Sequence, residues 1–565
     1  MSASKRVAVV GAGPSGLATV KELLEEGHEP VCFERAASLG GVFRFDEDAG
    51  VVWESCRLTS SGLLTAFSDF PVAPNRAEHM KTSEYVEYLT QYCDAFGVRE
   101  RLRFGTSVEA VTRESSGGWR VATIGRDGKR SEERYDAVAV CSGLHQNPHR
   151  PRFEGEETFP GRIMHGAEYR RPAEVAGKRV LVIGAGESGA DIVAEVAEHA
   201  AETVLSLRRG VGVVARKRYG YPNDFFNCRL NNSAAHWVFQ TRHPSDTWKL
   251  NLYRAVFFPL IVADKCVQKL FELVDKLRPL RPLLRWPRLG RAAIAQARIN
   301  RATERLTKDL LDASGGTLQE QFGTKSDEFV RAMAAGRCRQ AAAVARFDGK
   351  RVLFEDGTRY EPDLVILCTG FDVKVPFLDE ALTRGPRFLE AFVPSVGTSL
   401  GFIGFLRPAF GAIPPLAELQ ARWFALLLSD KAALPPEAEM RASIERLRGF
   451  RRHYFRAVRE RLDYLVDFYS FCDELASMIG CKPSLSAIRQ EGLRFRVRFF
   501  VAPFVAAQYR LVGPHAKPWI ARQVITGLPV AQPRHAIALF YLRWTLSRAL
   551  HRLLGPEFAP KLALH

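Results

Sequence analysis

The alternation of apolar and polar residues near the N-terminus predicts a β-α-β unit. A short apolar run from Arg6 to Val10 leads into a glycine turn, then into a stretch with helical periodicity, and then into a second apolar run that ends at Glu34. Short β-branched runs predict buried strands, and apolar residues spaced three to four apart predict a helix. Strands that alternate with helices in this way form parallel sheets, so we predict an α/β fold.

The same pattern occurs a second time in the middle of the chain. An apolar run begins at Arg179, a helix-like stretch follows, and another apolar run extends from Thr203 to Leu207. Each copy carries a G-x-G-x-x-G turn, whose glycines let the backbone approach a pyrophosphate at the helix N-terminus. We therefore predict two Rossmann-like dinucleotide-binding domains. Their cofactor-binding turns are Gly11, Ala12, Gly13, Pro14, Ser15 and Gly16 in the first copy, and Gly184, Gly186, Glu187, Ser188, Gly189, Ala190 and Asp191 in the second.

The two copies differ at the end of the second strand, where the ribose of a dinucleotide binds. Glu34, which is followed by Arg35, places a carboxylate about 20 residues past the first turn, where it can accept both ribose hydroxyls. In the second copy Arg208 and Arg209 stand there instead, and guanidinium groups match a 2′-phosphate. This difference predicts FAD at the first site and NADPH at the second. The alternative for the two arginines is an ordinary solvated turn.

The chain has 565 residues, enough for two or three domains, and a formal net charge of +17. This excess favours an acidic partner, which could be nucleic acid, anionic lipid or a phosphate-rich cofactor. Nucleic acid is excluded from our prediction because no zinc module or recognition helix accompanies the charge. The ten cysteines form no C-x-x-C pair and no Cys/His cluster with metal-ligand spacing, so we expect reduced thiols and no metal. The first residues lack a signal-peptide pattern, which predicts an intracellular protein that is not secreted.

Residues 252–291 are apolar and basic together. Leucines and Trp286 are interspersed there with Arg278, Arg281, Arg285, Arg288 and Arg291, and the C-terminal stretch after residue 534 has a similar composition. Neither stretch is apolar over the roughly 18 to 20 residues that a spanning helix needs. We predict peripheral contact with the cytoplasmic face of a membrane, with arginines at phosphate level and apolar groups below. The alternative is a buried helical subdomain with a solvated basic face in a cytoplasmic protein.

Between the two copies, residues 159–172 read FPGRIMHGAEYRRP. This stretch resembles the fingerprint of the flavin-containing monooxygenases, F-x-G-x-x-x-H-x-x-x-(Y/F)-(K/R), which is filled here by Phe159, Gly161, His165, Tyr169 and Arg170. The related Baeyer-Villiger enzymes typically carry tryptophan where Tyr169 stands. The resemblance implies that the fingerprint couples the positions of the two domains and takes no part in the chemistry.

The resemblance extends over nearly the whole chain. GGVFRF, from Gly40 to Phe45, is similar to the flavin-covering segment of the family, and ILCTGF, from Ile366 to Phe371, is similar to a strand-end motif. Segments around Arg407 to Trp423 and Gln508 to Pro514 are similar to family members of the eukaryotic type. The further cofactor-binding residues that the resemblance implies are Gly41, Val42, Phe43, Thr369 and Gly370.

The resemblance also implies a reaction. NADPH reduces FAD, the reduced flavin adds O2 to give a C4a-hydroperoxide, and the retained NADP+ shields this adduct from water. The oxidant then oxygenates a soft nucleophilic heteroatom, an amine nitrogen or a thioether sulfur, of a small xenobiotic-like or metabolite substrate. Two alternatives stay open: Baeyer-Villiger oxygenation of a ketone, and an NADPH oxidase or electron-transfer flavoprotein that produces H2O2. A homodimer is also compatible with the sequence.

One position departs from the family pattern. The family usually places asparagine in a turn ahead of a D-F-P segment, whereas RLTSSGLLTAFSDFP has Thr59 at that position. Asparagine offers an amide donor and an acceptor, and threonine offers one hydroxyl. The resemblance implies that Thr59 and the neighbouring Ser60 are catalytic residues that contact the flavin and orient peroxide or nicotinamide. The alternative is a plain turn residue in an enzyme that releases H2O2.

The architecture that we expect has an inserted NADPH-binding domain, a basic helical insertion and a C-terminal helical cap. Its segments are residues 1–155 and 335–450 for the FAD-binding domain, 156–220 and 301–334 for the NADPH-binding domain, 221–300 for the basic apolar insertion, and 451–565 for the cap with its membrane-associating tail.

Overall fold

The computed structural model describes residues 4–218, 220–229, 287–315, 323–454 and 464–531, and a few isolated positions after 531. Most of the stretch with predicted membrane contact, residues 252–286, lies outside the described residues, as does nearly all of the C-terminal stretch. Within the described part, no helix is long and apolar enough to cross a bilayer.

The first dinucleotide unit is a parallel five-stranded sheet in the order β20-β7-β1-β2-β3. Its strands are β1 (Arg6–Val10), β2 (Glu29–Glu34), β3 (Leu102–Phe104), β7 (Ala137–Val140) and β20 (Leu400–Phe402). Both faces of β1 are buried, because Val7 and Val9 pack in the core with α1 (Pro14–Glu25) and α10 (Ile413–Leu428), and Ala8 and Val10 pack on the opposite side. This double burial explains why the strand reads as one apolar run.

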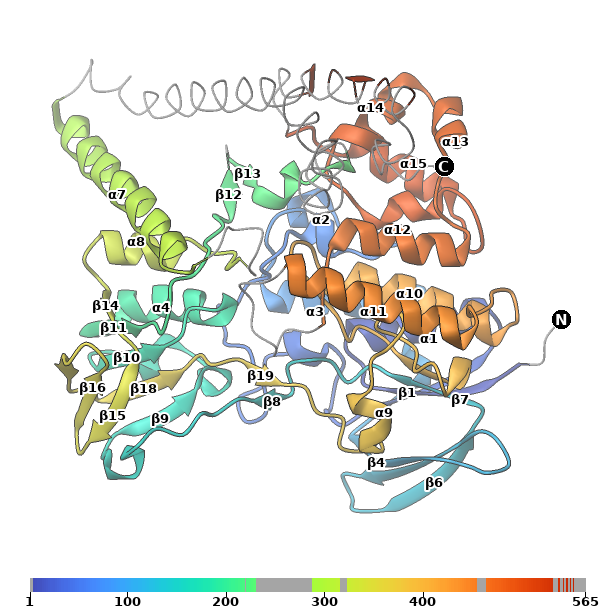
Figure 1. Cartoon of the computed structure of the whole chain (residues 1–565), viewed down its shortest axis with the longest axis horizontal. Helices are drawn as coiled ribbons and strands as arrows, with labels where there is room; N and C mark the ends of the chain where they lie inside the picture. Colours follow the sequence, from blue (N-terminus) through green and yellow to red (C-terminus); the bar gives the residue numbers. More distant parts are fainter. Residues whose placement is uncertain are drawn as a thin grey trace.

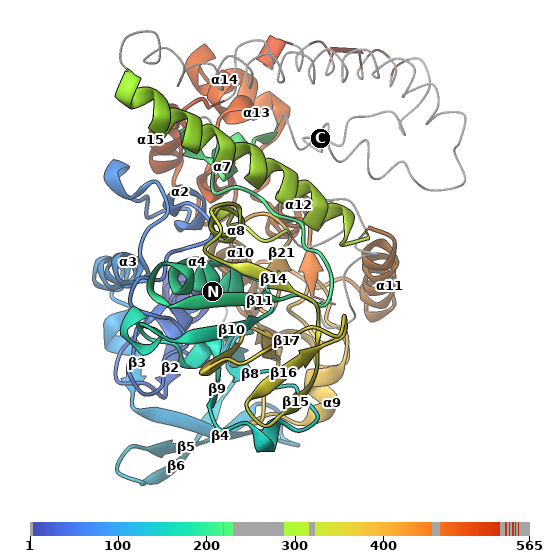
Figure 2. The same cartoon turned by 90° about the vertical axis from the view of Figure 1, so that its left-hand side faces the viewer.

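The second unit is also a parallel sheet, in the order β14-β11-β10-β18-β9. Its strands are β9 (Arg162–His165), β10 (Arg179–Ile183), β11 (Glu202–Ser206), β14 (Arg339–Ala341) and β18 (Leu364–Leu367). Helix α4 (Glu187–His199) covers it together with α8 (Glu328–Ala334), and α7 (Pro287–Asp312) packs on α8 (Figure 2). The prediction of an α/β fold with two Rossmann-like units is confirmed.

One expected boundary is wrong. The sequence places the return to the FAD-binding domain at residue 335, but β14 and β18 both pair within the second sheet. The chain returns to the first unit only after β18, when β19 (Phe371–Asp372) pairs with β8 (Asn147–Pro148). In Figure 1 these two short strands cross between the two sheets. β18 is an apolar strand like those of the first unit, and the three residues of β14 are too short a run to show a periodicity, so neither pattern reveals to which sheet the strand belongs.

The remaining strands form small sheets at the edges of the two units. They are β4 (Thr106–Arg113), β5 (Trp119–Gly125) and β6 (Arg130–Tyr135), then β15 (Val344–Asp348), β16 (Arg351–Phe354) and β17 (Arg359–Tyr360), and the pairs β12 (Lys217–Arg218) with β13 (Tyr221–Pro222) and β21 (Arg407–Pro408) with β22 (Leu465–Val466). The other helices are α2 (Gly62–Thr65), α3 (Thr82–Ala95), α9 (Glu380–Arg384) and α11 (Glu437–Tyr454).

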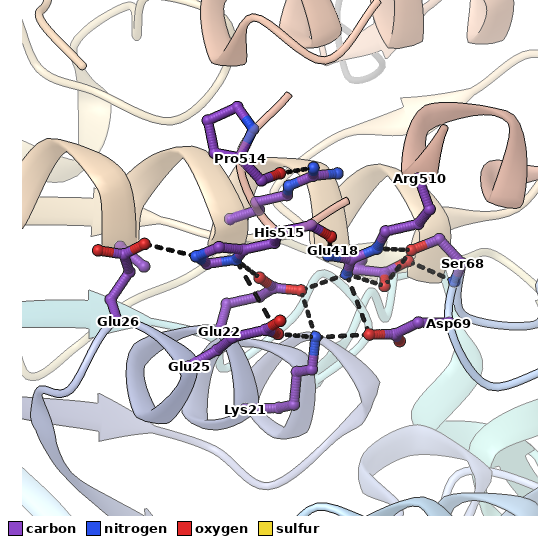
Figure 3. Close-up of polar contacts among 12 residues, drawn as sticks. Lys21, Glu22, Glu25, Glu26, Ser68, Asp69, Glu418, Arg510, Pro514 and His515 are labelled. Carbon is purple, nitrogen blue, oxygen red and sulfur yellow. Dashed lines mark hydrogen bonds and ion pairs between the residues drawn. The ribbon is translucent and has the colours of Figure 1, made fainter. Parts of the chain in front are cut away.

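The C-terminal part of the described chain is a helical cap, as the sequence predicts. Its helices are α12 (Phe468–Ile479), α13 (Leu485–Gln490), α14 (Leu493–Val501) and α15 (Pro518–Gly527). Arg510, which follows α14, inserts a fully buried guanidinium between α1 and α10 (Figure 3). Its Nη2 lies 2.5 Å from Glu22 Oε1 and 2.9 Å from Glu418 Oε1.

Further ion pairs complete this buried cluster on α1. Lys21 Nζ lies 2.6 Å from Asp69 Oδ2, and His515 Nδ1 lies 2.6 Å from Glu22 Oε2. Burial by itself raises the pKa of a carboxyl group, but Arg510 and Lys21 hold the pKa of Glu22 well below its usual range and bring that of Asp69 to about 2. Glu22 and Asp69 therefore stay ionised, whereas burial raises the pKa of Glu418, and the contacts of the cluster tie the cap to the helix that follows the first glycine turn.

Candidate active site

One continuous cavity of about 1860 Å³ runs between the two dinucleotide units. Both glycine turns, the segment from Gly41 to Phe43, the Thr59 turn and the strand end at Thr369 line it. Of the residues for which the sequence predicts a site, three do not line the cavity: Ala12, Gly16 and Ala190. They lie behind its wall, where Gly16 and Ala190 are fully or nearly buried parts of α1 and α4 and Ala12 is covered completely.

The first turn forms a cradle of bare backbone. Gly11 has a φ of +105°, and a Cβ there would lie 2.9 Å from the carbonyl oxygen of Cys141. A Cβ on Gly41 would lie 2.8 Å from the Cα of Gly13. Glu34 braces the turn from the end of β2, where its Oε2 accepts a hydrogen bond of 2.8 Å from the N–H of Ala12. The space that these glycines keep open, beside a carboxylate at the strand end, fits the pyrophosphate and ribose of FAD.

The second turn repeats this geometry. Gly184 has a φ of +101°, and a Cβ there would lie 2.7 Å from the carbonyl oxygen of Cys368. Gly186 faces open space, with no other atom within 4 Å of an added Cβ. Arg208 and Arg209 line the cavity directly after β11, where the ribose end of a dinucleotide lies in such a unit. A cradle with guanidinium groups at the ribose end fits NADPH.

The fingerprint residues connect the two units. Arg170 donates hydrogen bonds of 2.9 Å and 2.8 Å to the carbonyl oxygens of Glu47 and Gly50 in the first unit. The ring of His165 lies 3.1 Å, through Nε2, from the carbonyl oxygen of Gly370. Tyr169 is buried and donates to Glu195 Oε1 at 2.7 Å. These contacts are structural, which is the role that the resemblance implies for the fingerprint.

The turn that carries Thr59 is fixed on both sides. The Ser60 hydroxyl donates to the carbonyl oxygen of Gly411 at 2.8 Å, and the N–H of Leu58 donates to Met80 at 2.9 Å. Thr59 itself is partly exposed on the cavity wall, and its hydroxyl makes no hydrogen bond to the described residues. Of the two predicted catalytic side chains, Thr59 thus offers its hydroxyl to the cavity, whereas the hydroxyl of Ser60 is already used to hold the turn.

Sequence reasoning predicts Glu187 as a cofactor-binding residue but misses its two basic partners on the same wall, Arg407 and Lys325. Glu187 begins α4, and its carboxylate lies 3.0 Å from Nη2 of Arg407 and 3.4 Å from Nζ of Lys325. Although burial raises it, the pKa of Glu187 stays below its usual value because of Lys325 and Arg407. Burial and the nearby Arg407 lower the pKa of His145, another wall residue, to about 4, so its imidazole is neutral at pH 7. These residues come from distant parts of the chain, so local spacing gives no signal for them.

The carboxylate of Asp191, in contrast, is already engaged by another side chain of the protein. It lines the cavity but forms a close ion pair with Arg216. Burial raises the pKa of Asp191 to about 6, and Arg216 offsets part of this rise. The side chain therefore fixes the segment that follows β11 against α4.

The chain is similar to flavoprotein monooxygenases over nearly its full length. A profile of the flavin-binding monooxygenase-like (FMO-like) family matches residues 4–275 and 288–529. The chain is 31% identical over 529 residues to a 4-hydroxybenzoate brominase (decarboxylating) from Marinomonas mediterranea, covering 93% of each protein. It is 30% identical over 530 residues to flavin-containing monooxygenase 5 of Mus musculus, covering 91% of this chain and 90% of that one.

A solved structure shows the same fold. Cyclohexanone monooxygenase from Rhodococcus sp. Phi1, bound to NADP+, matches with a TM-score of 0.56 at 17% sequence identity. The match covers 84% of this chain and 97% of the other. At this identity the likeness supports the two-unit architecture and leaves the substrate open.

The position of Arg208 yields a test of the second cofactor site. Replacement by alanine is expected to raise the KM for NADPH about tenfold or more, because a charge-assisted hydrogen bond to the 2′-phosphate is lost. The KM for NADH, which lacks that phosphate, should change by less than about twofold. Steady-state kinetics with both nucleotides measures this, and Arg339→Ala, an exposed arginine on β14 paired with Glu202, is the matched control. If the substitution raised the KM values for NADPH and NADH equally, Arg208 would not be the residue that binds the 2′-phosphate.

Proposed function

Because the chain belongs to the flavin-binding monooxygenase-like family, we propose that it oxygenates an amine nitrogen or a thioether sulfur of a small xenobiotic-like or metabolite molecule. The cofactors are FAD and NADPH, and the enzyme is an O2-dependent oxidoreductase. The observation that carries the proposal is the single cavity: both glycine turns and the Thr59 turn line it, so a substrate in this space lies beside both cofactors.

The residues of the chain bind, orient and keep out water. Bound FAD supplies the redox chemistry through which electrons from NADPH activate O2. Phe43 is held on the cavity wall by an edge-on contact with Tyr85, with ring centroids 4.8 Å apart. The apolar side chains of Val42 and Phe43 would keep water away from bound FAD, whose redox chemistry with O2 needs a dry site. Thr59 supplies one hydroxyl that can donate to an oxygen atom in the cavity.

Tyr169 favours heteroatom oxygenation over the insertion of oxygen beside a ketone. It stands where related Baeyer-Villiger enzymes typically carry tryptophan, and its hydroxyl is engaged with Glu195. The brominase relative indicates a second candidate, in which the oxidant formed in the cavity acts on bromide and an electron-rich phenol. Both candidates need a pocket in which NADPH oxidation is coupled to attack on a soft nucleophile.

A panel of probe substrates tests the proposal. With NADPH and O2, thioanisole and N,N-dimethylaniline are expected to give the sulfoxide and the N-oxide, and cyclohexanone is expected to give little lactone. Product analysis together with NADPH and H2O2 assays measures this. A lactone as the main product would support Baeyer-Villiger oxygenation, and a brominated product from 4-hydroxybenzoate with bromide would support the second candidate. Release of one H2O2 per NADPH with every probe would contradict oxygen transfer altogether.

We also propose peripheral contact with the cytoplasmic face of a membrane through residues 252–291 and the C-terminus. The support is compositional: arginines alternate with apolar residues, and each basic group near an anionic surface contributes about 1 kcal/mol.

Flotation with vesicles of phosphatidylcholine and phosphatidylserine tests this contact. Replacing Arg278, Arg281 and Arg285 by glutamine is expected to weaken binding about 100-fold, since about 3 kcal/mol of attraction is removed. Replacing the exposed Arg120, Arg130 and Arg134 of the β5–β6 edge by glutamine is the matched control and should leave flotation unchanged. If both variants bound the vesicles equally well, the proposed membrane contact would be contradicted.

A further inference from the structure

A short segment after β13, residues 223–229, contacts both the Thr59 turn and the C-terminal cap. We call it the connector. It begins with a 3-10 turn from Asn223 to Phe226 and directly follows β13. Asp224 lies at its start and Arg229 at its end, and both side chains point to other parts of the molecule. The connector therefore joins two regions that are otherwise distant in the sequence.

Asp224 contacts the Thr59 turn. Its Oδ2 accepts a hydrogen bond of 2.6 Å from the N–H of Ser61, a fully buried residue that caps the N-terminus of α2. The other carboxylate oxygen, Oδ1, is buried and makes no hydrogen bond to the described residues. Burial raises the pKa of Asp224. Among the described residues, the carboxylate thus makes its one hydrogen bond to the turn that carries Thr59.

The hydrogen bond at Ser61 is one of three contacts that anchor the turn around Thr59. Leu58 and Ser60 are held by Met80 and Gly411, and Asp224 supplies the anchor on the far side. Of these three anchors, Asp224 is the one that uses an ionisable side chain. Without it the buried N–H of Ser61 would lose its acceptor, and the turn would be held by the contacts of Leu58 and Ser60 alone.

Arg229 fixes the other end of the connector in the cap. Its guanidinium, 5% exposed, donates to Gln508 Oε1 at 2.5 Å and to Asp473 Oδ1 at 3.1 Å. It also lies 4.9 Å from the ring centroid of Phe504. A backbone hydrogen bond of 2.8 Å from the N–H of Phe504 to the carbonyl oxygen of Asn227 adds a further contact. The position of Asp224 thus depends on how the cap is docked.

We propose that Asp224 is a positioning residue that holds the Thr59–Ser61 turn at the cavity, and that Arg229 anchors Asp224 to the C-terminal cap. The role of the turn in coupling NADPH use to oxygenation rests on the proposed function. The contact between Asp224 and Ser61 does not rest on the proposed function, because it is a property of the folded chain. The position of the Thr59–Ser61 turn then depends on how the cap is docked.

Two measurements on the FAD-loaded enzyme test this proposal. In the wild type, hydrogen–deuterium exchange of the Ser61 amide is expected to be slow. In Asp224→Ala it should be about tenfold faster or more, because the acceptor is lost. With thioanisole as probe, the share of NADPH that ends as H2O2 should rise toward the value of Thr59→Val, while the KM for NADPH stays within about twofold of wild type. Asp224→Asn, which keeps an acceptor of the same shape, should restore most of both properties.

The controls separate positioning from general damage. Asn223→Ala removes a side chain of the same 3-10 turn that donates to Ala215 at 2.8 Å, and it should change neither measurement. Arg229→Met should act in the same direction as Asp224→Ala. Fast exchange of the Ser61 amide in the wild type overturns the proposal even if a variant fails to fold. Unchanged exchange and H2O2 yield in Asp224→Ala also overturn it. If the wild type oxygenates no probe, the proposed function fails, and the exchange data still decide the positioning role.

Discussion

The cavity depends on the close approach of backbone to backbone at the two glycine turns. A Cβ on Gly16 would lie 1.8 Å from the carbonyl oxygen of Gly11, and a Cβ on Gly189 would lie 2.3 Å from that of Gly184. These contacts let α1 and α4 begin directly against their strands, so that the N–H groups of each first turn face the same space. The β8–β19 crossing and the contacts of Arg170 then set the two units on opposite sides of that space.

The cap stabilises this arrangement from the rear of α1. A buried ion pair gains little net stability over an apolar pair, but removing one partner costs about 3–5 kcal/mol because the other charge stays buried. Arg510 therefore specifies where the cap docks, since it pairs with Glu22, Asp69 and Glu418 together and is the one cation that pairs with Glu418 among the described residues. The same cap holds Arg229, so docking on α1 and the position of the connector both depend on the cap helices.

The sequence predicts the parts of the site that depend on local spacing. The glycine turns, Glu34, the two arginines after β11 and the fingerprint all lie where their motifs place them, because each is fixed by the strand or helix that carries it. The Glu187–Arg407 pair and the Asp224–Ser61 contact join residues far apart in the chain, and no periodicity reports such pairs. The predicted return to the FAD-binding domain at residue 335 is wrong for a related reason. The sequence of an apolar strand such as β18 does not indicate in which sheet the strand pairs.

The central claim is that an oxygen atom from O2 is transferred to a nucleophile inside the cavity. Its most direct test is the oxidation of thioanisole with NADPH under ¹⁸O2, in the presence of catalase, with mass spectrometry of the sulfoxide. The account predicts one ¹⁸O atom in the sulfoxide and a yield that catalase does not reduce. A sulfoxide that disappears when catalase is added, or one whose oxygen comes from water, would contradict it.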